Sequence, residues 1–109
     1  HAPHTLSEKE RQYGECPSGM PGIEFTLPLL LDAHQRGLFT LEQIVALTSQ
    51  RAKDIFGLIQ NEDIVLVDLE KIATVQHTHS KCRWTPYEGL TLQGWPIYTI
   101  LNGRVFDCQ

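Results

Sequence analysis

Histidine is the side chain with the widest chemical range in this sequence, and four of the five histidines form two close pairs. The proline between His1 and His4 disfavours α-helical geometry in the residue before it, so the two imidazoles do not share a helix face as metal-binding pairs usually do. His77 and His79 have the spacing of residues on one side of a strand, which recurs in zinc sites. Their neighbours are polar, and no third ligand follows at a standard interval. Taken alone, both pairs are expected to be exposed loop residues.

The three cysteines have no disulfide or metal signature. Cys16, Cys82 and Cys108 are widely spaced, odd in number and form no C-x-x-C pair. Disulfide frameworks and zinc sites usually contain paired or closely spaced cysteines. The pattern therefore predicts reduced thiols in a cytoplasmic protein.

A turn-rich segment, residues 16–22, contains two prolines and two glycines that impose an unusual backbone path. Such a path lets a backbone amide or carbonyl approach a ligand closely, but it also suits a rigid linker into a helix. Ser18 and Gly19 lack the G-x-S-x-G context of an exposed nucleophile, so we do not expect a serine hydrolase. Ligand contact and linker both remain open for this segment.

The composition is that of one small globular domain: 109 residues, 41% hydrophobic and 20% charged, with a net charge of −4. Nucleic-acid binding is not expected, because neutralising phosphates requires clustered cations. The longest apolar run, residues 27–31, is interrupted by Pro28 and is too short to span a bilayer. The chain starts at His1 and its only methionine is Met20, so we expect it to begin inside a longer gene product.

The elements that position these groups change in kind along the chain. Residues 1–22 have no sustained periodicity and predict a long irregular loop. A helix is expected from Pro28 to Gly37, since proline suits a first helical turn and glycine suits a helix end. Thr40 and Gln43 have the spacing of a capping box, which predicts the start of a second helix.

A further short helix is expected after Ser49, with Ala52, Ile55 and Phe56 facing inward and Gly57 after its end. The helices between residues 28 and 56 then carry more apolar surface than a few short strands can cover. Part of their core must come from elsewhere, and we expect the isolated chain to expose a sizeable apolar face.

The second half of the sequence has the period of strands. Residues 64–67 are a β-branched run that ends at Asp68, which predicts a buried strand. Residues 97–101 and 104–106 flank Asn102-Gly103, the strongest two-residue signal for a β-hairpin. The chain is therefore expected to form a loop, then helices, then a small sheet.

Several separated stretches resemble one family. Residues 1–6 (HAPHTL), followed by Glu8 and Lys9, are similar to a motif of the dihydroorotases, enzymes of the amidohydrolase superfamily. Residues 17–24 (PSGMPGIE), the leucines 29–31 and residues 80–89 (SKCRWTPYEG) with Gly94 are similar to further parts of the same family. The resemblance covers nearly the whole chain and corresponds to the C-terminal third of a dihydroorotase.

The resemblance implies an α/β fold: the C-terminal end of a (β/α)8 TIM-barrel metal-dependent hydrolase plus part of a small β-sandwich subdomain. Residues 1–61 would be the last barrel loop and the C-terminal helices of the amidohydrolase barrel. Residues 62–109 would be strands of the small β subdomain. The family usually has a longer loop between residues 58 and 63, which leaves the strand register before Asp63 open.

The resemblance also implies the reversible, zinc-dependent conversion of N-carbamoyl-L-aspartate to L-dihydroorotate in de novo pyrimidine biosynthesis. His4 matches the histidine that binds the substrate carboxylate, and the backbone at Ser18 and Gly19 matches the loop that contacts the substrate ring. The family's catalytic aspartate would precede His1, which matches a position that is not a metal ligand. The zinc ligands of the parent enzyme are expected outside this chain, so the 109 residues alone are expected to be inactive.

Two other functions remain open. One is a non-catalytic dihydroorotase-like scaffold that partners aspartate transcarbamoylase, and the residues upstream of His1 would discriminate it from the enzyme. The other, more distant, is an independent metal-binding module of His1, His4, His77 and His79. The expected partners of the enzyme are its substrate pair, the missing N-terminal part of the barrel, and a second copy or aspartate transcarbamoylase, with no nucleic acid and no membrane.

Overall fold

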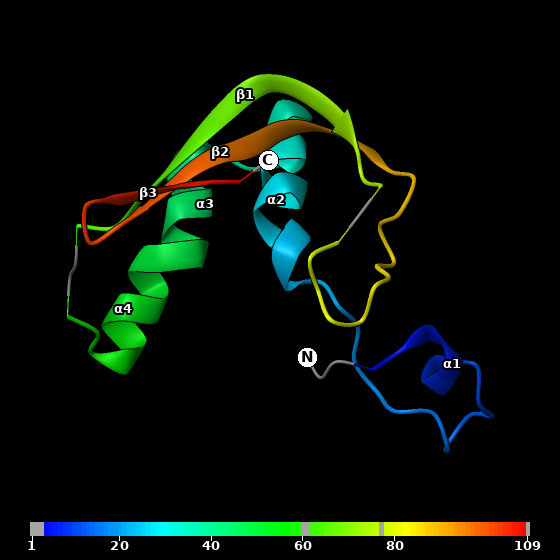
Figure 1. Ribbon diagram of the computed structural model, residues 1–109. Coiled ribbons are helices and arrows are strands. Elements are labelled where there is room, and N and C mark those ends of the chain that lie inside the picture. The colour runs from blue at the N-terminus through cyan, green and yellow to red at the C-terminus, as the bar shows by residue number, and fades with distance from the viewer. Residues whose placement is uncertain (1–3, 60–61, 77, 109) are drawn as a thin grey trace. The chain divides into compact units, whose positions relative to one another are not determined.

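The computed structural model of the protein describes residues 4–59, 62–76 and 78–108, with helices in the first half and strands in the second (Figure 1). The helices are α1 (Leu6–Lys9), α2 (Thr26–Gln35), α3 (Leu41–Val45) and α4 (Arg51–Phe56), with a 3₁₀ turn at Ile23–Phe25 and a π-helical turn at Ala46–Gln50. The strands β1 (Ile64–Thr74), β2 (Thr91–Leu101) and β3 (Arg104–Asp107) form one sheet in the order β1-β2-β3. The expected order of loop, helices and sheet is confirmed.

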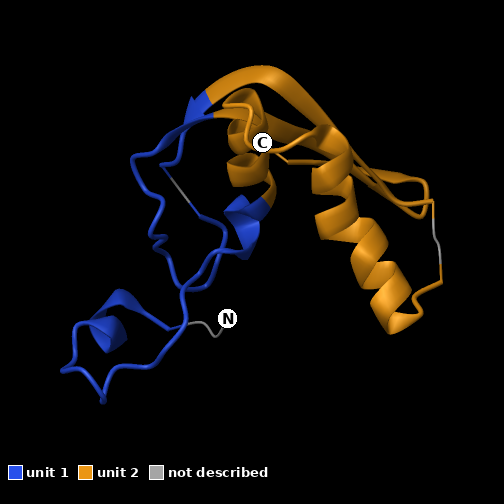
Figure 2. Ribbon diagram, turned by 180° about the vertical axis from the view of Figure 1, so that it is seen from behind, with its two compact units in different colours: residues 1–26, 73–92 blue, residues 27–72, 93–109 orange. Residues whose placement is uncertain are grey.

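The chain divides into two compact units, each built from segments that are far apart in the sequence (Figure 2). The first unit comprises residues 1–26 and 73–92, and the second comprises residues 27–72 and 93–109. The buried apolar side chains of the first unit include Phe25, Val75, Cys82 and Leu92. The second unit buries Leu31 and Ile44.

Helix α2 begins at Thr26, two residues before the expected start at Pro28. The difference arises because a 3₁₀ turn leads directly into the helix, and the Thr26 hydroxyl donates to the carbonyl of Gly22 at 3.2 Å. Pro28 still lies in the first turn, where its missing N–H is tolerated. The expected end is confirmed: Gly37 has φ +74° and its N–H donates to the carbonyl of His34 at 2.8 Å.

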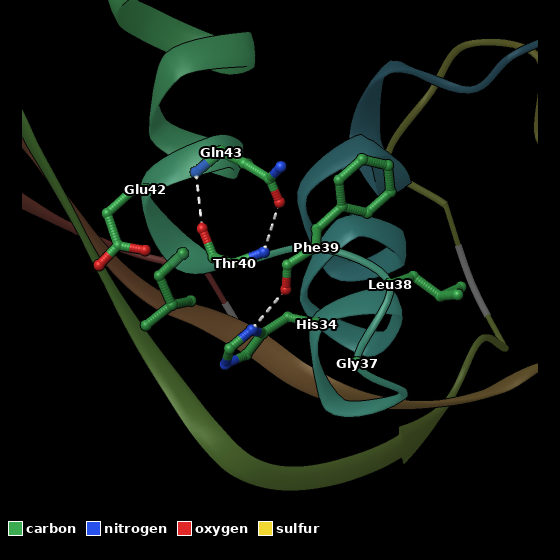
Figure 3. Close-up of a pocket in the computed structure, with 8 residues that line it drawn as sticks. His34, Gly37, Leu38, Phe39, Thr40, Glu42 and Gln43 are labelled. Atoms are coloured by element: carbon green, nitrogen blue, oxygen red, sulfur yellow. Dashed lines mark hydrogen bonds between the residues drawn. The ribbon is translucent and has the colours of Figure 1, made fainter.

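The capping box predicted at Thr40 is present at the start of α3. The N–H of Gln43 donates to the Thr40 hydroxyl oxygen at 3.2 Å, and the N–H of Thr40 donates to the Gln43 side-chain oxygen at 2.8 Å (Figure 3). Nδ1 of His34, near the end of α2, lies 2.8 Å from the carbonyl oxygen of Phe39. The short connection between α2 and α3 is thus fixed at both ends.

The expectation that Ser49 caps a new helix is wrong. Ser49 lies inside the π-helical turn that joins α3 to α4, so the chain stays helical where a cap would need a break. In the same turn, the Thr48 hydroxyl donates to the carbonyl of Ile44 at 2.9 Å. A widened turn accommodates the extra residue without ending the helix.

Helix α4 ends where the sequence predicted, but its apolar side chains do not face inward within this chain. Gly57 has φ +61° and closes the helix. Ile55 and Phe56 are 74% and 73% exposed, which contradicts their assignment to the core. The neighbouring large apolar side chains that are also exposed are Leu38, Leu41, Val45, Leu47, Leu58 and Ile59. These helices therefore present the apolar face that the sequence led us to expect.

Strand β1 is longer and more exposed than the short buried strand predicted for residues 64–68. It continues to Thr74 as an edge strand of the sheet, and its first residues, Ile64, Val65 and Leu66, are exposed. Asp68 does not end it, although its Oδ1 accepts the N–H of Glu70 at 2.9 Å. Successive side chains of a strand point to opposite faces of the sheet, so the exposure of three consecutive residues shows that neither face is covered at this end of β1.

The hairpin predicted around Asn102-Gly103 is confirmed. Strands β2 and β3 pair in antiparallel fashion with Leu101 opposite Arg104, so two residues form the turn. Asn102 and Gly103 have φ values of +50° and +75°, as a type I′ turn requires. The N–H of Asn102 also donates to Oδ1 of Asp63 at 2.9 Å.

Close contact between α2 and β2 organises the second unit. A Cβ atom added to Gly94 would lie 2.6 Å from Cβ of Leu31, so the strand backbone lies directly on the helix. Next to it, Oδ1 of buried Asp32 accepts the N–H of Gln93 at 3.0 Å, and the other carboxylate oxygen pairs with Arg36. Glycine is needed at position 94 both for this approach and for its φ of +97°.

Candidate functional site

The three residues expected to bind substrate, His4, Ser18 and Gly19, all lie in the first unit and outside helices and strands. His4 is half-buried and precedes α1, whereas Ser18 and Gly19 are exposed. No hydrogen bond links His4 directly to the other two among the described residues. Their placement depends on the side chains described next.

Helix α1 is a single turn within the segment predicted to be an irregular loop. Thr5 and Glu8 form a capping box in which the backbone N–H and the hydroxyl of Thr5 donate to Oε2 of Glu8 at 2.6 and 2.8 Å. These hydrogen bonds lower the pKa of the Glu8 carboxyl. The T-x-x-E spacing was the sequence signal for this helix.

Lys9, the last residue of α1, connects the helix to the turn-rich loop. Its Nζ donates to three successive carbonyl oxygens, those of Pro17, Ser18 and Gly19, at 2.5, 3.2 and 2.6 Å. Gly19 has φ +84°, a conformation that glycine adopts without strain. One ammonium group therefore holds the carbonyl side of the loop that is predicted to contact a ligand.

The backbone of His4 is held by the 80–89 stretch. The indole N–H of Trp84 donates to the carbonyl oxygen of His4 at 2.9 Å. The same stretch also contacts residues 17–25, because the Thr85 hydroxyl donates to the carbonyl of Pro21 at 3.4 Å and the rings of Tyr87 and Phe25 meet edge to face at 6.1 Å. The structure thus brings together three stretches that carry the family resemblance.

Glu24 anchors the loop that follows β1. Its carboxylate accepts the Thr78 hydroxyl at 2.5 Å and the backbone N–H of His79 at 3.0 Å, and Nδ1 of His79 lies 2.8 Å from Oε1. Partial burial alone would raise the pKa of Glu24, but the hydrogen bonds from Thr78 and His79 outweigh it and lower the pKa. The His79 side chain is 87% exposed in a loop, as predicted; its partner Glu24 was not predicted.

A zinc site cannot be built from the residues that the structure describes. Within residues 4–59, 62–76 and 78–108, no three His, Cys, Asp or Glu side chains gather closely enough to hold a metal ion. His1 and His77 lie outside the described residues. The described residues supply no donor set for zinc, and no chemical step is assigned to a metal on this chain.

Other features of the chain do not involve these residues. A pocket beside the α2–α3 connection is lined by His34 and residues 37–43, and the hydrogen bonds drawn there belong to the helix cap and the turn (Figure 3). Cys16, Cys82 and Cys108 form no disulfide among the described residues, and their reduced state stays a prediction. No helix in the described parts of the chain is both long enough and apolar enough to span a membrane.

Comparison with known proteins supports the family resemblance, although no family model matches the chain. The sequence is 38% identical to the dihydroorotase of Halobacterium salinarum over 113 residues, which covers 94% of this chain and 26% of that protein. It is 40% identical to the dihydroorotase of Pyrococcus furiosus over 115 residues, covering 96% of this chain and 27% of that protein. The chain thus spans about a quarter of the length of these curated relatives.

Two solved structures are similar to this chain in fold over nearly its whole length. A D-hydantoinase matches 93% of this chain with a TM-score of 0.81 and 27% identity, and the match covers 24% of that protein. An inactive dihydroorotase-like domain of a CAD-like multifunctional protein from Chaetomium thermophilum matches 97% of this chain with a TM-score of 0.73 and 25% identity, covering 31% of that chain. The described residues contain helices and one three-stranded sheet, and they contain no barrel.

Proposed function

We propose, on the premise that this chain is dihydroorotase-like over nearly its whole length, that it is the C-terminal portion of a dihydroorotase. The observation that carries the proposal is the 38–40% identity to two dihydroorotases over 94–96% of the chain. The reaction would be the reversible cyclisation of N-carbamoyl-L-aspartate to L-dihydroorotate in pyrimidine biosynthesis, in the cytoplasm. In the reverse direction the parent protein would be a hydrolase that opens the cyclic amide of L-dihydroorotate.

In this proposal the first unit supplies part of the substrate site. His4 would donate a hydrogen bond to the substrate carboxylate, and the backbone at Ser18 and Gly19 would contact the ring. Two contacts support these roles: the Trp84 indole holds the His4 carbonyl, and Lys9 holds the loop that carries Ser18 and Gly19. A charge-assisted hydrogen bond from a fixed donor is the interaction that a desolvated carboxylate requires.

The rest of the enzyme would lie in the part of the protein that this chain does not include. We propose that residues 1–61 complete a (β/α)8 barrel and that residues 62–109 belong to a small β subdomain. The exposed apolar side chains of α3 and α4 support a missing packing partner. Zinc in the parent protein would be held by ligands outside this chain. When bound, it would activate water for amide hydrolysis.

The test is His4→Ala in the full-length protein, with kcat/KM for both substrates and zinc content measured together. We expect kcat/KM to fall by the equivalent of about 2–3 kcal/mol, typical of a hydrogen bond to a charged group, with zinc retained. His34→Ala, which changes a histidine of the second unit, is the matched control. Activity close to wild type would remove His4 from the site, and loss of zinc would show that its role is not carboxylate binding.

A second candidate function is a non-catalytic dihydroorotase-like scaffold, with aspartate transcarbamoylase as the proposed partner. The specific observation in its favour is the match to the inactive dihydroorotase-like domain from Chaetomium thermophilum. The full-length protein discriminates between the two candidates: an enzyme turns over dihydroorotate when loaded with zinc, whereas a scaffold does not and instead co-purifies with the transcarbamoylase. A third candidate, a metal-binding module of His1, His4, His77 and His79, would require the isolated chain to bind one zinc ion tightly in equilibrium dialysis.

A further inference from the structure

The contact between Lys9 and the turn-rich loop fixes the direction of the loop's peptide groups. Three successive carbonyl oxygens, from Pro17, Ser18 and Gly19, converge on Nζ of Lys9 within 3.2 Å. In a trans peptide the N–H of the next residue points away from the carbonyl, and no cis peptide occurs among the described residues. The N–H groups of Ser18, Gly19 and Met20 therefore point away from the ammonium group.

Among the described residues, these three N–H groups have no backbone acceptor. Ser18, Gly19 and Met20 are exposed, and no backbone hydrogen bond donated by them occurs within residues 4–59, 62–76 and 78–108. Backbone donors in that state bind water or a ligand. Three of them in succession on one side of a loop form a surface that suits carbonyl or carboxylate oxygens.

We propose that Lys9 is a positioning residue, which holds the loop so that the N–H groups of residues 18–20 act as ready-made donors to substrate oxygens. This inference rests on the proposed function. Without the ammonium, three carbonyl dipoles pointing to one place would repel each other, and the peptides would rotate toward water. The positive charge also polarises each peptide and strengthens its outward N–H as a donor.

The position of Lys9 in the fold supports this role. It ends the one-turn helix α1, whose start is fixed by the Thr5–Glu8 capping box directly after His4. Trp84 holds the carbonyl of His4. Lys9 thus sets the loop of residues 17–20 relative to the proposed carboxylate donor, and its ammonium group lies on the carbonyl side of the loop, opposite the N–H groups.

The experiment compares Lys9→Met with Lys81→Met in the full-length protein. Both changes remove one positive charge from the first unit, but Lys81 is exposed and its side chain has no partner among the described residues. Steady-state kinetics with dihydroorotate is the first readout. Limited chymotrypsin digestion is the second, because the segment carries Tyr13, which is accessible and is followed by Gly14.

We expect Lys9→Met to raise KM about tenfold with kcat nearly unchanged, since a loop that must be ordered on binding weakens ground state and transition state alike. Cleavage within residues 10–22 should be faster than in wild type and in Lys81→Met, and Lys9→Arg should restore part of both properties. If Lys9→Met does not fold, Lys9→Gln, which keeps two donors but no charge, replaces it.

A Lys9 variant with wild-type KM and wild-type cleavage would overturn the inference. So would a Lys81 variant that matched it in both readouts, because loss of charge alone would then be the cause. The proposed function fails separately, if the zinc-loaded wild type does not turn over dihydroorotate. In that case the cleavage comparison alone decides whether Lys9 holds the loop.

Discussion

The close approach of β2 to α2 predicts an unusually large effect for a single added methyl group. In Gly94→Ala the new Cβ would start 2.6 Å from Cβ of Leu31, and the backbone carbonyl carbon of Leu31 lies 3.5 Å away. The obstruction is the base of a buried side chain on a helix, so no rotamer change can remove it. The helix and the strand would have to separate.

The magnitude follows from two contributions. A residue other than glycine at φ +97° costs about 1–2 kcal/mol of backbone strain. Forcing an extra methyl group into a packed contact adds about 1–3 kcal/mol. Gly94→Ala should therefore destabilise the protein by about 2–5 kcal/mol in total.

Gly14→Ala is the matched control, because Gly14 has φ +95° and no atom within 4 Å of an added Cβ. It should cost the strain alone, about 1–2 kcal/mol. Urea denaturation of the full-length variants, combined with hydrogen exchange of α2 and β2, measures both effects. If the two variants lose the same stability and α2 exchanges as slowly as in wild type, the close packing of residue 94 on Leu31 is refuted.

Three further predictions address other contacts. Asp32→Ala should destabilise the protein by about 1–3 kcal/mol because the N–H of Gln93 loses its acceptor, and Asp32→Asn, which keeps Oδ1, should cost less in urea denaturation; equal losses would contradict this. The folded-state pKa of Glu24 is lowered from 4.5, so its ionised form stabilises the fold above that pH and the contribution is lost as the pH falls below it. Glu24→Gln should therefore make stability less sensitive to pH as the pH falls below 4.5, and an unchanged pH profile would show that the contact adds nothing. The 109-residue chain alone should bind a hydrophobic dye through Ile55, Phe56 and their neighbours, and a dye-silent compact monomer would count against a missing partner.

The sequence was sufficient to predict helix caps and turns whose interacting groups are close together in the chain. The Thr40 capping box and the Asn102-Gly103 turn each depend on a few adjacent residues, and both formed as predicted. The same reasoning applied to Thr5 and Glu8 would have found α1, but the lack of periodicity in residues 1–22 concealed it. Ser49 shows the reverse error, since a residue type that favours caps was placed inside a continuing helix.

The contacts that hold the proposed site could not be predicted, because residue types alone do not show which groups meet in the fold. Lys9 contacts backbone carbonyls, and every residue has a carbonyl, so no partner was visible in the sequence. Glu24 meets Thr78 across 54 residues, a pairing that only the fold creates. For the proposed site, the resemblance supplied the candidate residues His4, Ser18 and Gly19, and the structure supplied the side chains that hold their segments.

The hydrogen bond between Asp32 and Gln93 cannot form until late in the synthesis of the chain on the ribosome. Its two residues are 61 positions apart, so at elongation rates of about 5–20 residues per second α2 waits roughly 3–12 s for its strand. During that interval Leu31 has no strand backbone to cover it, and the Asp32 carboxylate has only Arg36 as a partner. The apolar side of α2 therefore stays uncovered until the strand that packs on it has been translated.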